Sequence, residues 1–309
     1  MRKPLILSCA ALALIASGIT AGLAEARPGD RLRARFGQQN AASNAPEAPG
    51  KQGFSYGRDA LQNLDFWPAQ TTRSPAPLVI FVHGGGWKQG SKDNASGAWK
   101  APHYTAAGYA YAAINYRLVP AATVEDEAAD VAAALRYLID HAAALGIDPA
   151  RIVLMGHSAG AHLVALVGTD ERYLKGAGLS FASIEGVIPV DGAAYDVPRQ
   201  IRDGGNFMHD TYVAAFGTEP ARQRALSPTF QAARPNAPAF LLIHVQRKDG
   251  VAQNEELEAA LRKAGTAVTR QGFPGDGLMG HMSINRSLGD PAYAATPVVD
   301  GWLKTVFGR

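Results

Sequence analysis

The sequence has almost no cysteine and little excess charge of either sign, and both scarcities narrow what the protein can be. Its 309 residues include one cysteine, Cys9, which lies in an N-terminal apolar stretch. Removal of that stretch would leave neither a disulfide nor thiol chemistry. The chain has 30 lysines and arginines against 27 aspartates and glutamates, a formal net charge of +3. Because the chain lacks the large excess of basic residues that is typical of nucleic-acid-binding proteins, we expect no nucleic-acid partner.

Long apolar runs are equally scarce, because the N-terminal stretch is the one run that approaches the length of a membrane span. It begins with the positive Met1-Arg2-Lys3, continues uncharged to Ala24, and ends in the small-x-small pattern Ala24-Glu25-Ala26. Signal peptides have this arrangement. We therefore predict a cleaved signal over residues 1–26, a secreted or periplasmic protein, and no stable membrane insertion after cleavage. Retention of the segment as an anchor stays open as the alternative.

The remaining sequence divides into a short linker and one large domain. Residues 27–52 are rich in polar and small side chains without an apolar period, which predicts a disordered linker. Hydrophobic residues make up 47% of the chain, enough for one substantial core. We therefore assign residues 53–309 to a single folded domain.

Strand and helix signals alternate along this domain. β-rich runs predict strands at 78–82, 109–114, 151–155, 186–190, 240–245 and 267–273, and helical spacing predicts helices at 122–144, 159–167, 255–264 and 298–307. This alternation is typical of an α/β protein with a mostly parallel central sheet and helices on both faces.

A possible nucleophile lies between a predicted strand and a predicted helix. Gly156-His157-Ser158-Ala159-Gly160 has the form G-x-S-x-G. In this setting the sharp turn holds the serine in a strained conformation at the sheet edge, and the flanking glycines allow close packing. The positive N-terminal end of the following helix favours developing negative charge nearby. The alternative is a tight turn with an ordinary serine.

A second glycine-rich motif follows the strand at 78–82. His83-Gly84-Gly85-Gly86-Trp87 can bend so that main-chain N–H groups point at one spot. Acyl transfer needs such donors to stabilise the oxyanion of the tetrahedral intermediate. We expect the amides of Gly85, Gly86 and Ala159 to form this oxyanion hole. A flexible turn or a phosphate cradle is the alternative, although the chain lacks G-x-x-x-x-G-K-[ST].

Together these two motifs resemble the α/β-hydrolase esterases. The similarity runs from about Tyr56 to Trp302, and is greatest with the hormone-sensitive-lipase-like branch and the kynurenine formamidase and feruloyl/acetylxylan esterase groups. Two features differ from the lipase-like branch: His157 replaces the usual aspartate, and little room remains before the glycine-rich motif for an N-terminal cap. The resemblance implies an α/β-hydrolase fold and cofactor-free hydrolysis of carboxylic esters.

The remaining catalytic groups are an acid and a base. The acid should lie just after a strand, at the sheet edge that carries Ser158. In the family that the chain resembles, the catalytic residues occur in the order serine, acid, histidine. Asp249, after the strand at 240–245, is our prediction; Asp191, after the strand at 186–190, is the rival. His281 is the only histidine after Asp249, and we place it in a loop before the last helix. We therefore predict a Ser158–His281–Asp249 triad.

The sequence thus predicts a serine carboxylesterase that works through an acyl-enzyme. Its substrate would be a small-molecule or polymer-linked ester, with specificity set by residues 191–235. Histidines and carboxylates do not fall at metal-ligand spacings, and we expect no cofactor and no metal. Two alternatives stay open: an arylformamide hydrolase like kynurenine formamidase, which the export signal disfavours, and a non-catalytic binding module on the same fold.

Overall fold

A computed structural model describes residues 45–71, 75–233 and 235–308 of the chain. The predicted signal peptide and most of the predicted linker lie outside these residues. The remainder of the linker, from residue 45, has no regular structure until the first strand begins at Gln52. Within the described ranges, no helix combines the length and apolarity that a bilayer crossing requires.

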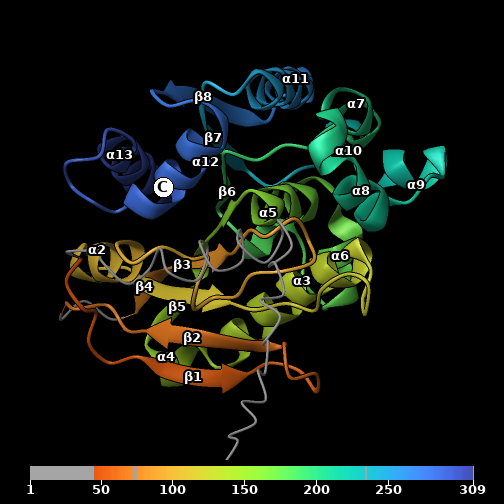
Figure 1. The fold of residues 1–309 in the computed structure, drawn as a ribbon. Coiled ribbons are helices and arrows are strands. Elements are labelled where there is room, and N and C mark those ends of the chain that lie inside the picture. Colours follow the sequence, from red (N-terminus) through yellow and green to blue (C-terminus); the bar gives the residue numbers. More distant parts are fainter. Residues whose placement is uncertain (1–44, 72–74, 234, 309) are drawn as a thin grey trace, which may run out of the picture.

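One sheet forms the centre of the fold, with the strand order β1-β2-β4-β3-β5-β6-β7-β8 (Figure 1). Its strands are β1 (Gln52–Ser55), β2 (Asn63–Trp67), β3 (Ala76–Val82), β4 (Ala110–Ile114), β5 (Ile147–His157), β6 (Gly186–Val190), β7 (Ala239–Val245) and β8 (Ala267–Phe273). The strands from β4 to β8 in this order pair in parallel, while β1 and β2 add an antiparallel edge. The predicted α/β-hydrolase fold with its mostly parallel sheet is confirmed.

Helices cover both faces of the sheet (Figure 1). α3 (Val124–Asp140), α5 (Ala159–Thr169) and α11 (Lys248–Lys263) contribute to the core on one face, and α2 (Lys100–Ala106), α12 (Gly277–Ser287) and α13 (Ala295–Phe307) to the core on the other. Successive residues of β3 alternate between these cores, as the period of a strand requires. Both cores are apolar, which explains why the central strands lack a polar face in the sequence.

Two helix predictions differ from the structure at their ends. The predicted helix at 122–144 divides into α3 and α4 (Ala142–Leu145), separated at His141. α3 begins where Thr123 and Asp126 form a capping box. The helix predicted from residue 255 begins at Lys248 in the structure. The prediction missed the first two turns because their residues are mostly polar and show no apolar period. This second difference matters for the site.

Between β6 and β7 the chain forms a separate layer of short helices, α7 (Val197–Asp203), α8 (Gly205–Phe216), α9 (Pro220–Ala225) and α10 (Pro228–Gln231). We refer to it as the α7–α10 layer; it lies above one end of the sheet (Figure 1). Tyr195, Tyr212 and Phe216 are buried in the core of this region. α6 (Glu171–Gly176) and a short 3-10 turn (Phe181–Ser183) connect α5 to β6.

Candidate active site

Ser158 occupies the strained turn that the sequence predicts. It lies between β5 and α5 with φ 57° and ψ −118°, a conformation that costs free energy for a residue with a side chain. A Cβ atom at Gly160 would collide with the carbonyl oxygen of Val82, and one at Gly156 would collide with that of Gly160. Both glycines are therefore required by the close approach of the main chain.

The glycine-rich loop packs directly against this turn. A Cβ atom on Gly84 would lie 2.8 Å from the Ser158 Cβ, and one on Gly85 would collide with the carbonyl oxygen of Gln89. Gly85 and Gly86 have φ values of 136° and 61°. Gly86 and Ala159 line the cavity beside Ser158, whereas Gly85 is absent from its wall among the described residues. Two of the three residues predicted to supply oxyanion donors thus line the cavity.

His281 lies on helix α12 rather than in a loop, so the predicted loop at this position is wrong. From Gly277 to Ser287 the chain is helical. His281 Nδ1 lies 2.6 Å from Asp191 Oδ2. A carboxylate can only accept, so Nδ1 carries the proton and Nε2 is left as the acceptor. That tautomer suits a general base for serine.

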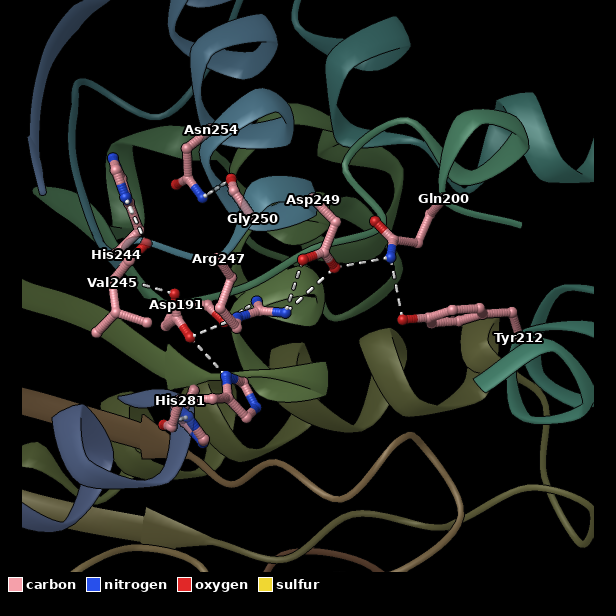
Figure 2. Close-up of polar contacts among 11 residues, drawn as sticks. Asp191, Gln200, Tyr212, His244, Val245, Arg247, Asp249, Gly250, Asn254 and His281 are labelled. Carbon is pink, nitrogen blue, oxygen red and sulfur yellow. Dashed lines mark hydrogen bonds and ion pairs between the residues drawn. The ribbon is translucent and has the colours of Figure 1, made fainter. Parts of the chain in front are cut away.

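Asp191, and not Asp249, is the partner of His281, which corrects the sequence prediction (Figure 2). Asp249 lies in the first turn of α11 and binds Arg247 and the Gln200 side chain instead. Because α11 begins at Lys248, Asp249 is held on the helix and away from the imidazole. Asp191 was the rival in the sequence, and the structure brings it to the base.

The sheet order explains this outcome. β6 is the direct neighbour of β5, and the Ser158 N–H donates to the Val190 carbonyl at 3.1 Å. Asp191 is the first residue past β6 and therefore lies at the nucleophile's own level. Its backbone is strained, with φ 45°. What distinguishes the two aspartates is that Asp191 follows β6, the strand next to β5. This distinction can be made only when the order of the strands in the sheet is known.

Partners keep the buried Asp191 carboxyl ionised. Burial raises its pKa, but the hydrogen bond from His281, the charge of Arg247 and the N–H of Val245 together outweigh burial and hold the pKa well below its usual range. Oδ1 accepts from Val245 N–H at 3.0 Å, and Oδ2 accepts from Arg247 Nε at 3.0 Å. The site therefore contains a permanent negative charge behind the imidazole.

Three further histidines surround the site as neutral structural groups. Burial lowers the pKa of His83 and of His162 to about 4. Burial, and then the proximity of His281, hold the pKa of His157 well below its usual range. Because a neutral imidazole can donate from one nitrogen, His157 Nε2 donates to the main-chain oxygen of His281 at 2.9 Å. His157 thus braces the backbone of the base.

Ser158, His281 and Asp191 line one cavity of about 680 Å³. Its wall is apolar on one side, at Trp87, Met208 and Leu278, and polar on the other. The polar side comes from α7 and the start of α11, at Arg199, Gln200, Asp203, Arg247, Lys248, Asp249 and Gln253. In the described part of the chain, no group of three or more histidines, cysteines or carboxylates could hold a metal ion.

The arrangement can carry out acyl transfer. His281 has an acceptor nitrogen, a fixed carboxylate behind it, and a serine on the same cavity wall. No hydrogen bond joins Ser158 to His281 among the described residues, and catalytic hydrogen bonds are often formed only when substrate is bound. Gly86 and Ala159 line the same cavity.

Comparisons with known proteins show which proteins the chain resembles. The family model described as BD-FAE matches residues 64–261. The chain is 36% identical over 110 residues to a probable isoprenylcysteine alpha-carbonyl methylesterase of Oryza sativa, covering 36% of this chain and 26% of that protein. It is 34% identical over 128 residues to carboxylesterase NlhH of Mycobacterium tuberculosis, covering 40% of each. The chain thus spans well under half the length of these curated relatives.

A solved structure shows the same fold over a greater length. Esterase B from Lactobacillus Rhamnosis superposes with a TM-score of 0.73 at 22% identity, covering 91% of both chains. At that level of identity the likeness concerns the fold.

Proposed function

Because the chain belongs to the BD-FAE family of α/β-hydrolase esterases, we propose that it is a serine carboxylesterase with Ser158 as nucleophile, His281 as base and Asp191 as supporting acid. One observation carries the proposal: a strained serine shares a cavity with an imidazole whose Nδ1 is bound to a buried carboxylate. A binding module would have no need of this strain or of a fixed tautomer.

The proposed reaction has two halves. His281 Nε2 accepts the Ser158 proton as the hydroxyl oxygen attacks the ester carbonyl, while Asp191 stabilises the imidazolium. The amides of Gly86 and Ala159 stabilise the oxyanion, and return of the proton to the alcohol breaks the carbon–oxygen bond. Water, deprotonated by His281, then releases the acid from the acyl-enzyme. The substrate is a small-molecule or polymer-linked ester that fits the 680 Å³ cavity.

Replacement of the nucleophile tests this function. We expect Ser158→Ala to lower kcat for p-nitrophenyl acetate by at least about 10⁴-fold, and to abolish labelling by a fluorophosphonate probe. Thermal unfolding of the variant serves as the control for folding. Turnover at the wild-type rate, or continued labelling, would remove Ser158 from the mechanism. A panel of acetyl, butyryl and feruloyl esters together with an aryl formamide then separates esterase from formamidase activity.

We also propose that the protein is exported and acts outside the cytoplasm. The basic start, the apolar stretch to Ala24 and the Ala24-Glu25-Ala26 pattern support this. N-terminal sequencing of the protein from periplasm and medium tests it, and we expect a mature chain that begins at Arg27. A chain that retains Met1 in the membrane fraction would instead indicate an anchor.

A further inference from the structure

We propose that Arg247 is a positioning residue, which fixes the carboxylate of Asp191 behind His281, and that Asp249 acts by holding Arg247. The inference rests on the proposed function. It gives a role to the aspartate that lies on the cavity wall without facing the base. It also explains why two carboxylates and one guanidinium are placed at the ends of β6 and β7.

All three guanidinium nitrogens are used (Figure 2). Nε donates to Asp191 Oδ2 at 3.0 Å, and Nη2 donates to the main-chain oxygen of Asp191 at 3.2 Å. Nη1 lies 3.3 and 3.2 Å from the two carboxylate oxygens of Asp249. A planar fork can satisfy three directions at once, which an ammonium group on a flexible stem cannot.

This fork fixes both the side chain and the backbone of the proposed acid. The carboxylate accepts from Val245 N–H on Oδ1 and from Arg247 and His281 on Oδ2, so its plane is held by donors from three directions. The bond from Nη2 holds the carbonyl of a residue whose φ is 45°. A strained residue keeps such a conformation only where its surroundings determine it.

Asp249 fixes the other end of Arg247. Its Oδ2 accepts from Gln200 Nε2 at 3.1 Å, and the same nitrogen lies 3.0 Å from the hydroxyl of Tyr212 (Figure 2). Gln200 lies on α7 and Tyr212 on α8. A continuous chain of polar contacts therefore joins His281 to the α7–α10 layer, and Arg247 is its central member.

The charge of Arg247 has a second consequence, for the protonation of the base. Arg247 and His281 bind the same oxygen of Asp191, so the guanidinium competes with an imidazolium for that negative charge. Loss of the positive charge should leave Asp191 free to stabilise the imidazolium more strongly. The other ionisable groups around Arg247, Asp191 and His281 are Asp249, Tyr212, His157, Tyr195 and Tyr293, with Lys100 beyond His157. The substitutions at Arg247 leave all of these residues in place.

Arg247→Gln and Arg247→Lys separate the two contributions. We expect Arg247→Gln to lower kcat for p-nitrophenyl acetate by about 10- to 100-fold, since small displacements of a catalytic group have effects of that size. We expect it also to move the acidic limb of the kcat/KM profile upward by about 0.5 to 1 pH unit. Arg247→Lys keeps the charge but loses the fork, so kcat should fall by at least about fivefold without a shift of the limb.

Arg270→Gln is the matched control. Arg270 is a partly buried arginine that is paired with Glu258 and lies away from the cavity wall. This variant should keep the wild-type kcat and pH profile. An Arg247→Gln protein with the wild-type limb and kcat would overturn the inference. Should that variant fail to fold, Arg247→Lys decides, and wild-type kcat there would overturn it.

The two proposals fail in different ways. Absence of esterase turnover in the wild-type protein, or turnover that survives Ser158→Ala, would contradict the proposed function. Turnover that depends on Ser158 but not on Arg247 would contradict only the positioning role.

Discussion

Two carboxyl groups, Asp191 at the end of β6 and Glu127 in the first turn of α3, are both fully buried, and their protonation states are opposite. Asp191 accepts hydrogen bonds from three donors, and its pKa is held well below the usual range despite burial. The carboxyl oxygens of Glu127 accept no hydrogen bond from any described residue, and burial raises its pKa to about 10. At neutral pH the Asp191 carboxyl is therefore ionised and the Glu127 carboxyl is protonated.

The difference shows that partners, and not depth, decide the charge of a buried carboxyl. Asp191 lies where strand ends, a helix and a guanidinium converge, so donors are available from several elements. Glu127 projects from a helix into an apolar core, where its neighbours Tyr116 and Val119 supply little compensation. The free-energy cost of a buried charge is therefore met at the candidate active site and avoided elsewhere by protonation.

The largest expected effect is a loss of kcat when the negative charge of Asp191 is removed. Asp191→Asn should lower kcat by about 10³- to 10⁴-fold on a short-chain aryl ester, because the amide cannot hold the imidazole in the required tautomer or stabilise its cation. Steady-state kinetics at pH 8 checks this, with circular dichroism to confirm folding. Activity within tenfold of wild type would show that Asp191 is not the acid.

The second position should respond in stability rather than activity. The Glu127 side chain ionises at pH 4.5 in the unfolded chain and near 10 when folded, so at pH 7 folding forces proton uptake that costs about 3 kcal/mol. Glu127→Gln removes that cost and should raise the free energy of unfolding by up to about 3 kcal/mol, measured with urea at pH 7. Glu125→Gln on the same helix loses an ion pair with Arg222 and should not stabilise. Equal stability of Glu127→Gln and wild type would contradict the assignment.

A buried cation on the opposite face of the sheet sharpens the comparison. Lys100 donates to Ser96 O and to both oxygens of Asn285, and burial lowers its pKa to about 7. Between pH 7 and 10 the unfolded chain protonates Lys100 while the folded chain does not, so stability rises with pH. Over the same range Glu127 is protonated only in the folded chain, so its contribution to the free energy of unfolding falls as the pH rises.

The contributions of Lys100 and Glu127 to the free energy of unfolding each change by about 1.4 kcal/mol per pH unit. Because they have opposite signs, they should nearly cancel in the wild-type protein. The free energy of unfolding of Glu127→Gln should therefore rise from pH 7 to 10, and that of Lys100→Met should fall. Urea unfolding at each pH measures both. Parallel pH profiles for the two variants would contradict the opposite protonation of Lys100 and Glu127.

The smallest effect is expected from the aspartate that does not face the base. Asp249→Asn keeps the size of the side chain and one acceptor oxygen for Arg247 and Gln200, and should lower kcat by no more than about fivefold. Parallel measurement with Asp191→Asn gives the contrast directly. A greater loss at position 249 than at 191 would restore the assignment made from the sequence.

Much of the site was predictable because its signals are local. The strand, turn and helix around Ser158 follow from a β-rich run, a G-x-S-x-G motif and a run of helix formers. β6 and β8 were predicted with their observed ends, Gly186–Val190 and Ala267–Phe273. The antiparallel strands β1 and β2 were not predicted, because short edge strands carry little apolar pattern. The early start of α11, hidden by polar residues, moved Asp249 from a loop onto a helix.

By itself, then, the sequence determined the class of fold, the strained serine, the glycine loop beside it and the histidine that we propose as its base. These depend on residues close together in the chain, or on there being one histidine after the last strand. Only the tertiary structure decided which aspartate faces that histidine. Asp191 and Asp249 each follow a predicted strand, and the chain pattern around one does not exclude the other. The order of strands in the sheet and the long-range contacts of Arg247 distinguish them, and neither is a local property.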